Sequence, residues 1–272
     1  MIVYRILDNI TDEKESASDL LGRLRQGDSM WRIHTRRAGF VDKCIQSWVD
    51  RQTRYLRNLS WEDQATIIAY TYDGHAIVNT FLRREFDWRE CARRGFVSRY
   101  DEFLFPIALP LFFRSWKEGV SYGSIIRWFW ENRRRITDAQ IHTVMKAYIQ
   151  RLSRIIRNAP PAPRNMTVYR GINGKHFLLL DRERSIITPS FLSSTLSVKE
   201  AKSFIPMKRA CCLQRIHVHR GHPVLFVAFL SYYPNELEIL FLPDSKLVDL
   251  NNNHTLGGKD RVVRVLEYQI RS

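Results

Sequence analysis

The feature that most constrains the fold is a change of pattern at residues 158–163, which read Asn-Ala-Pro-Pro-Ala-Pro. Proline cannot continue a helix, so this stretch is expected to end a helical region and to act as a stiff linker. After it, short apolar runs follow one another without regular strand–helix alternation, which predicts an α+β protein with an antiparallel or mixed sheet. The predicted strands are Thr167–Arg170, Ser190–Leu196, Cys212–Val218, Val224–Phe229, Glu236–Leu242 and Arg261–Ile270.

The region before this linker is predicted to be mainly helical. Ser60 is followed by Glu62 and Asp63, and a hydroxyl that caps free amides, followed by acids at the positive helix end, marks a helix start. All seven tryptophans lie between Trp31 and Trp130, so composition also separates an aromatic-rich helical half from a strand-rich half. Apolar residues at helical spacing predict further helices at residues 74–84 and 137–156, and one short helix at residues 198–204 of the strand-rich half.

The chain is strongly basic, with 43 Lys and Arg against 28 Asp and Glu and a formal charge of +15. Residues 1–160 hold 27 basic and 19 acidic groups, and residues 161–272 hold 16 and 9, so both halves share the excess. An excess of this size attracts nucleic acid, anionic membranes or acidic partners. A spread-out excess indicates nucleic-acid binding less strongly than one basic stripe does. Nucleic acid is therefore a possible partner, but no localised basic patch indicates it.

Neither membrane insertion nor a metal site is indicated. No apolar run approaches the roughly 18 residues that a membrane-spanning helix needs, and the N-terminus lacks the pattern of a signal peptide. The four cysteines show no CxxC spacing, and His217, His219 and His222 have no carboxylate or cysteine at ligand spacing, so no metal is expected. We therefore expect an intracellular, cytoplasmic protein that works in a reducing compartment.

The segment Pro234–Pro243 reads PNELEILFLP and places two carboxylates one residue apart. Read as a strand, it directs Glu236 and Glu238 to one face, because residues i and i+2 share a side. Leu237, Ile239 and Phe241 would then point into a core. A rigid strand would hold such a pair of carboxylates in place for catalysis. An ExE motif on an edge strand is, however, more often part of a solvated surface.

Three segments in order, Tyr169-Arg170-Gly171, Phe191 to Thr195 and Glu236-Leu237-Glu238, together resemble the mono-ADP-ribosyltransferases of the arginine–serine–glutamate class. Those enzymes carry an aromatic-Arg step, a Phe-x-Ser-Thr-Ser strand and a Glu/Gln-x-Glu strand. This chain has Ser-Ser-Thr in place of Ser-Thr-Ser, which keeps the hydroxyls. Segments that follow also match, namely KEAKSF, IHVHRGHPV, the Tyr-Pro-Asn-Glu-x-Glu loop and PDSK, and so do residues 69–71 with Asn79, Leu82 and Arg83.

The resemblance implies a helical N-terminal part followed by a strand-rich, mixed or antiparallel two-sheet NAD-binding core. It covers residues 56–272, with the strand-rich catalytic core at 164–272. Residues 85–135 match poorly and are interpreted as a helical, aromatic-rich insertion. Residues 1–55 are interpreted as an N-terminal extension, and both segments are candidates for target recognition.

The resemblance also assigns residues to NAD. Glu238 would stabilise the cation that forms when the bond between nicotinamide and ribose breaks, as carboxylates do in glycoside hydrolysis. Arg170 supplies a forked cation for the pyrophosphate. Ser193 would position the nicotinamide ribose and hold Glu238, and Gly171 would let the backbone approach the carboxamide because it lacks a Cβ. The adjacent hydroxyls of Ser194 and Thr195 complete the expected NAD-binding set.

Glu236 is the acceptor-side residue that the resemblance implies. In the family, a glutamate two residues before the catalytic one accompanies transfer to arginine, whose guanidinium is a poor nucleophile while protonated. Tyr232 and Tyr233 are placed to contact the acceptor or to stack on nicotinamide. The expected partner is thus a protein with an acceptor arginine.

Three functions remain open at the level of sequence. The first is an NAD-dependent protein-arginine ADP-ribosyltransferase that releases nicotinamide. The second is a glycohydrolase of the same fold that mainly hydrolyses NAD. The third is a non-catalytic module whose basic surface binds nucleic acid or protein. A chain of this kind is expected in a virus, a phage or an effector injected into a host cell.

Overall fold

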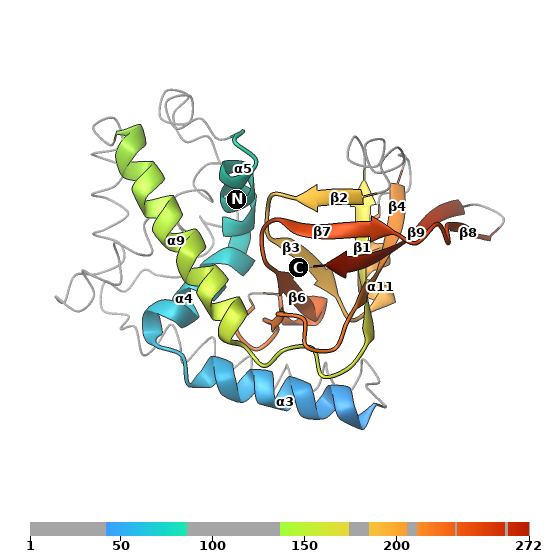
Figure 1. The fold of residues 1–272 in the computed structure, drawn as a ribbon, viewed down its shortest axis with the longest axis horizontal. Helices are drawn as coiled ribbons and strands as arrows, with labels where there is room; N and C mark the ends of the chain where they lie inside the picture. The colour runs from blue at the N-terminus through green and yellow to red at the C-terminus, as the bar shows by residue number, and fades with distance from the viewer. Residues whose placement is uncertain are drawn as a thin grey trace, which may run out of the picture. The chain divides into compact units, whose positions relative to one another are not determined.

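The computed structural model describes residues 42–85, 137–173, 185–205, 211–231, 233–258 and 261–271, and these fall into two compact units (Figure 1). Of the described residues, one unit holds 57–85, 137–154, 230, 231 and 233. The other holds 42–56 and 155–173, together with the remaining segments that carry the sheet. Most of the predicted insertion and of the N-terminal extension lies outside the described residues. The domain boundaries expected from the sequence therefore stay a prediction.

The first unit is built from helices. It contains α4 (Trp61–Ala69), a π-helical turn (Tyr70–Gly74), α5 (His75–Leu82) and most of α9 (Asp138–Asn158). The predicted helix start is confirmed, because Ser60 accepts a hydrogen bond from the amide of Asp63 at 3.3 Å. The predicted helices at 74–84 and 137–156 are also confirmed to within two residues at each end.

Long-range polar contacts join α4 to α9 within this unit. The hydroxyl of Tyr148 donates to the carbonyl of Thr66 at 2.5 Å, and Arg154 pairs with Asp63 at 2.6 Å. Burial together with the nearby Tyr70 raises the pKa of Tyr148 well above its usual value, so this hydroxyl stays a donor. None of the helices in the described part of the chain has the length and apolar character that a bilayer span requires.

The second unit holds a mixed, mostly antiparallel sheet of nine strands. Its order is β2-β7-β9-β4-β1-β3-β6-β5, with β8 also paired to β9, and only β4 and β9 run parallel. The strands are β1 (Met166–Asn173), β2 (Ser185–Thr188), β3 (Leu192–Thr195), β4 (Cys211–Val218), β5 (Leu225–Phe226), β6 (Glu238–Phe241), β7 (Ser245–Asp249), β8 (His254–Gly258) and β9 (Arg261–Arg271).

The two predicted sheets are two halves of this one sheet. The half with β3, β6 and β5 joins the other half through β1, where the register records a single pair, Tyr169 with Thr195. The predicted α+β class is confirmed, and so are the six predicted strands, although several are shorter than expected. β2, β7 and β8 were not predicted, because each is short and is defined by the strand beside it. The short helix predicted at 198–204 is α11 (Val198–Ser203).

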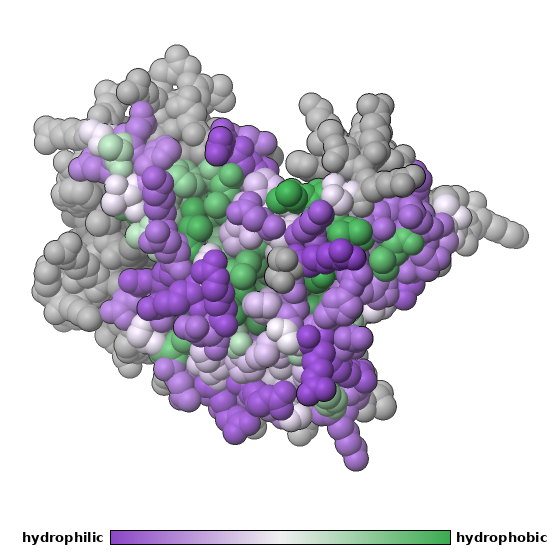
Figure 2. All heavy atoms as spheres, viewed as in Figure 1, coloured by the Kyte–Doolittle hydropathy of each residue, from purple (hydrophilic) through white to green (hydrophobic). Residues whose placement is uncertain are grey.

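The core of this unit lies between the sheet and α3 (Lys43–Arg57), a helix that the sequence did not reveal. Ile45, Trp48 and Val49 are buried in one apolar cluster with residues of β1, β4, β6 and β9. The indole of Trp48 tilts against Phe226 with the ring centroids 6.0 Å apart. The opposite side of α3 is charged and faces outward, as Figure 2 shows along the lower edge of the molecule.

A buried amide fixes α3 to the strands. The Gln52 side chain donates to the carbonyls of Pro160, at 2.6 Å, and Val224, at 3.0 Å. Its oxygen also accepts from the amide of Phe226 at 3.4 Å. One side chain therefore satisfies backbone groups on the linker and on the β5 strand, which would otherwise be buried without partners.

We predict that Gln52→Leu lowers the free energy of unfolding by about 2–4 kcal/mol, because it leaves several buried backbone groups unpaired. Urea unfolding at neutral pH measures the change. Gln46→Leu is the matched control on the same helix, since this side-chain amide donates to the exposed Asp50 at 3.1 Å. Its effect should stay within about 0.5 kcal/mol. Equal effects of the two substitutions would contradict the role given to Gln52.

Candidate active site

Strand pairing brings three of the predicted site residues onto one face of the sheet. In the antiparallel register of β3 and β6, Thr195 lies opposite Glu238, and Ser193 lies opposite Leu240. Because side chains alternate along a strand, Ser193, Thr195 and Glu238 share a side. Ser193 is the diagonal neighbour of Glu238, a separation that two short polar side chains can bridge.

Glu238 is held by a short chain of hydrogen bonds. The Ser193 hydroxyl donates to Oε1 of Glu238 at 2.5 Å. Nη1 of Arg170, on β1, donates to the backbone carbonyl of Ser193 at 3.0 Å. The three residues come from three adjacent strands, so the sheet itself determines the position of the carboxylate. Glu238 is only 8% exposed.

This environment raises the pKa of Glu238 to about 7. Burial is the main cause, because a desolvated carboxylate loses the stabilisation that water gives its charge. The hydrogen bond from Ser193 and the positive charge of Arg170 lower the pKa and offset part of this effect. The site therefore contains an acid that changes protonation state near neutral pH, which is typical of catalytic carboxylates.

The prediction that Glu236 and Glu238 point to one face of a single strand is wrong. Glu236 ends a 3-10 turn, Pro234–Glu236, and β6 begins only at Glu238. Leu237 between them has a φ of +48°, and its amide donates to the carbonyl of Pro234 at 3.3 Å. This turn interrupts the extended backbone, so the alternation of a strand does not apply before Glu238. The predicted burial of Leu237, Ile239 and Phe241 in the core is confirmed.

The structure gives Gly171 a role in packing, and its predicted role in NAD binding stays a prediction. A Cβ at this position would lie 2.2 Å from the backbone oxygen of Ala201 and 3.2 Å from Cβ of Phe204. The space that a side chain would take is therefore filled by the end of α11, which packs directly on β1. Glycine here permits a close helix–strand contact.

The remaining residues predicted to bind NAD or the acceptor lie in different surroundings. Oγ1 of Thr195 accepts a hydrogen bond from the amide of Ser197 at 3.0 Å, next to the start of α11. Ser194 lies on the opposite face from Glu238 and is buried, and its hydroxyl has no hydrogen-bond partner within the described part of the chain. Glu236 is half-buried. Tyr233 belongs to the helical unit, and Tyr232 lies outside the described residues.

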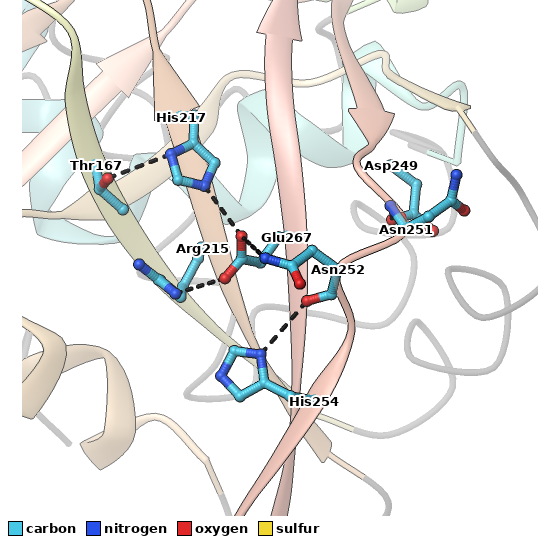
Figure 3. Close-up of polar contacts among 8 residues, drawn as sticks. All are labelled: Thr167, Arg215, His217, Asp249, Asn251, Asn252, His254 and Glu267. Carbon is cyan, nitrogen blue, oxygen red and sulfur yellow. Dashed lines mark hydrogen bonds and ion pairs between the residues drawn. The ribbon is translucent and has the colours of Figure 1, made fainter.

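Sequence reasoning missed a polar cluster on β4 and β9 (Figure 3). Glu267 is buried and pairs with Arg215 at 2.5 Å. His217 lies 3.4 Å from the same carboxylate and 3.4 Å from the Thr167 hydroxyl, and Asn252 donates to Glu267 at 3.0 Å. The available signal was a pair of polar residues two positions apart in each strand, namely Arg215 and His217 in β4 and Glu267 and Gln269 in β9. Among the described residues, no group of three or more His, Cys, Asp and Glu could hold a metal ion.

Burial alone would raise the pKa of Glu267, but the hydrogen bond from Asn252 and the nearby Arg215 and His217 outweigh it and lower that pKa. Glu267 therefore stays ionised, in contrast to Glu238. The two buried glutamates of the sheet differ because one is surrounded by donors and positive groups and the other is mainly desolvated.

Comparison with known proteins bears on this geometry. Residues 131–248 match the family model for the ADP-ribosyltransferase exoenzyme, and Arg170, Ser193 and Glu238 all lie inside that segment. This part of the chain is an ADP-ribosyltransferase domain. No curated protein matches the chain.

Solved structures share the fold of this chain at low sequence identity. Plx2a, an ADP-ribosyltransferase toxin from Paenibacillus larvae, aligns with a TM-score of 0.52 and 18% identity over 85% of this chain and 96% of its own. Vis toxin from Vibrio splendidus aligns with a TM-score of 0.50 and 14% identity, over 89% and 86%. The ADP-ribosylating toxin BECa of a Clostridium perfringens binary enterotoxin, solved with NADH, gives 0.52 and 13%, over 84% and 48%.

The raised pKa of Glu238 predicts how the stability of this protein changes with pH. Between about pH 4.5 and 7 the folded state holds a proton that the unfolded chain releases, so stability falls as pH rises. Glu238→Gln removes this effect. Urea unfolding should show that Glu238→Gln gains stability relative to wild type from pH 5 to pH 8, by at most about 3 kcal/mol.

Ile239→Val, a change on the same strand without a titrating group, is the control for this measurement. It should cost about 1 kcal/mol at both pH values. The difference in unfolding free energy between Glu238→Gln and wild type should therefore change with pH, unlike that of Ile239→Val. If it stays constant from pH 5 to pH 8, Glu238 does not have a raised pKa.

Proposed function

We propose that this protein is an NAD-dependent mono-ADP-ribosyltransferase that transfers ADP-ribose to an arginine of a target protein and releases nicotinamide. The observation that carries the proposal is the buried Glu238 carboxylate, held by Ser193 at 2.5 Å and lying within the influence of Arg170. The family match over residues 131–248 supports the reaction class. NAD acts as the substrate in this proposal, and no metal takes part.

The chemistry requires a carboxylate in this kind of place. When the bond between C1′ of the ribose and nicotinamide breaks, its electron pair leaves with nicotinamide and the ribose becomes an oxocarbenium-like cation. Glu238 in its ionised form stabilises that cation, and a desolvated site strengthens the interaction. The positive nicotinamide ring of bound NAD would itself favour the ionised state of Glu238.

Arg170 and Ser193 prepare the site for this step. The Arg170 side chain is half-buried, and its charge lowers the pKa of Glu238, so the two groups lie near one another. A planar guanidinium is suited to a pyrophosphate because it offers parallel N–H donors. Ser193 restricts the rotation of the Glu238 side chain through its hydrogen bond, which keeps the carboxylate oriented before substrate arrives. Thr195 lies directly opposite Glu238 and extends the polar surface.

Glu236 is the residue that we assign to the acceptor. Its place on the 3-10 turn, outside the strand, separates it from the carboxylate that faces the ribose. There it can pair with the incoming guanidinium and take the proton that the attacking nitrogen loses as it bonds to C1′. Tyr233 and Tyr232 precede this turn in the chain and are proposed to contact the acceptor.

Two substitutions test this division of roles. Glu238→Ala should lower nicotinamide release from NAD by about 100-fold or more, because the cation loses its stabilising charge. Glu236→Ala should lower labelling of agmatine, a small guanidine acceptor, by about 100-fold while nicotinamide release stays within about tenfold of wild type. Chromatography of nicotinamide and of labelled agmatine measures both activities.

Asp50→Asn, at an exposed acid on α3, is the control and should leave both activities unchanged. Full activity of Glu238→Ala would refute the assignment of the site. Nicotinamide release without labelled agmatine in the wild type would instead favour an NAD glycohydrolase, or transfer to an acceptor other than arginine.

A further inference from the structure

The backbone of Leu237 has a conformation that is unusual for an aliphatic residue. Among the described residues other than glycine, four have a positive φ, namely Arg84, Leu237, Asp244 and Asn251. Aspartate and asparagine adopt this left-handed region more readily than other residues, and Arg84 is exposed just after α5. Leu237, with a φ of +48°, is instead only 3% exposed. A buried leucine in this conformation indicates backbone strain, which tends to occur at functional sites.

Leu237 joins the sheet to the turn that precedes it. Its carbonyl accepts a hydrogen bond from the amide of Leu196 at 3.4 Å, which continues the ladder of β3 and β6 by one residue. Its own amide donates instead to the carbonyl of Pro234 at 3.3 Å, within the 3-10 turn that ends at Glu236. The carbonyl half of the residue thus belongs to the sheet and the amide half to the turn. Rotation about the N–Cα bond between the two halves, which φ measures, therefore moves Glu236 relative to Glu238.

Because both halves are fixed, the strain falls on φ. The Leu237 side chain is buried in the main apolar cluster of the sheet, so the carbonyl half cannot leave the sheet without exposing it to water. The hydrogen bond to Pro234 holds the amide half in the turn. An extended φ would release the strain and keep the side chain buried, because alternation along a strand already directs it toward the core. It would also bring Glu236 onto the face of Glu238 and so remove it from its present place on the turn.

We propose that the left-handed backbone of Leu237 directs the ribosyl cation to a guanidine acceptor in preference to water. Leu237 is a positioning residue, which acts by holding Glu236 outside the strand that carries Glu238. The inference rests on the proposed function and gives a role to the residue between the two glutamates, to which the resemblance assigns none. Cleavage of the bond to nicotinamide needs Glu238 and not Glu236, so this step does not depend on φ at Leu237.

The two fates of the cation differ in the group that attacks C1′. In transfer, a guanidine nitrogen bonds to C1′ and its proton passes to Glu236. In hydrolysis, the oxygen of water bonds to C1′ and a proton goes to solvent. The electron pair of the broken bond leaves with nicotinamide in both. When Glu236 is displaced, the guanidinium stays protonated and is a poor nucleophile, so water reacts in its place. Displacement of Glu236 therefore lowers transfer and spares nicotinamide release.

Leu237→Ile tests the proposal, because isoleucine has the same number of carbon atoms but a β-branched side chain, which strongly disfavours a positive φ. Labelling of agmatine should fall by about tenfold or more, since Glu236 no longer lies where it can take the proton. Nicotinamide release measured without agmatine should stay within about threefold of wild type, since Glu238 keeps its place in β6. The ratio of labelled agmatine to released nicotinamide measures the effect.

Leu237→Gly separates the backbone role from packing. Glycine adopts a positive φ without steric cost, but it buries no side chain. The melting temperature should therefore fall by about 5 °C or more, whereas the ratio of labelled agmatine to released nicotinamide should stay within about threefold of wild type. If Leu237 served packing alone, Leu237→Gly would be the more harmful variant and Leu237→Ile would resemble wild type. That reversed order would overturn the proposal.

Leu247→Ile is the matched control for the change of side-chain shape. Leu247 belongs to the same apolar cluster, is 1% exposed and lies in the extended strand β7, where a β-branched residue is favoured. This change should leave both rates within about twofold of wild type. If the wild type labels agmatine and Leu237→Ile has the same ratio, the role of Leu237 is refuted and the proposed function stands. If the wild type labels no agmatine, transfer to arginine is refuted, and the role of Leu237 with it.

Discussion

The removal of the Glu238 carboxylate from water is the physical constraint on which the site depends. Burial makes its charge costly, and the fold offsets this cost only in part, through the Ser193 hydroxyl and the nearby charge of Arg170. The same desolvation makes the carboxylate effective against a cation that forms beside it. The arrangement needs β1, β3 and β6 in one register, and α3 and α11 pack on these strands and hold them in place.

The turn before β6 gives the two glutamates of the ExE motif different surroundings. A positive φ at Leu237 is unfavourable for a leucine, but its side chain is 3% exposed and packs in the main core. Burial of that side chain therefore stabilises a backbone conformation that the residue would otherwise avoid. As a result Glu238 is fixed within the sheet and Glu236 lies on a half-buried turn, which fits one residue for the ribose and another for the acceptor.

The sequence predicted much of this fold, because helix caps, apolar periodicity and β-rich runs are local signals. It also predicted the pairing of Ser193 with Glu238, through the resemblance of three motifs. It did not reveal α3 as a helix, because the basic residues of the outer face hide the apolar face that packs on the sheet. The turn at Leu237 and the helix over Gly171 both depend on contacts between segments far apart in sequence, which no local pattern encodes.

The pH dependence of kcat/KM for nicotinamide release by the wild-type protein tests the central claim most directly. This ratio reports the protonation state of groups in the free enzyme. If a desolvated Glu238 must be ionised to stabilise the ribosyl cation, kcat/KM should rise tenfold per pH unit below the pKa of Glu238 and level off above about 7. A plateau that already begins near pH 5 would show that the carboxylate has an ordinary pKa, and would contradict the account.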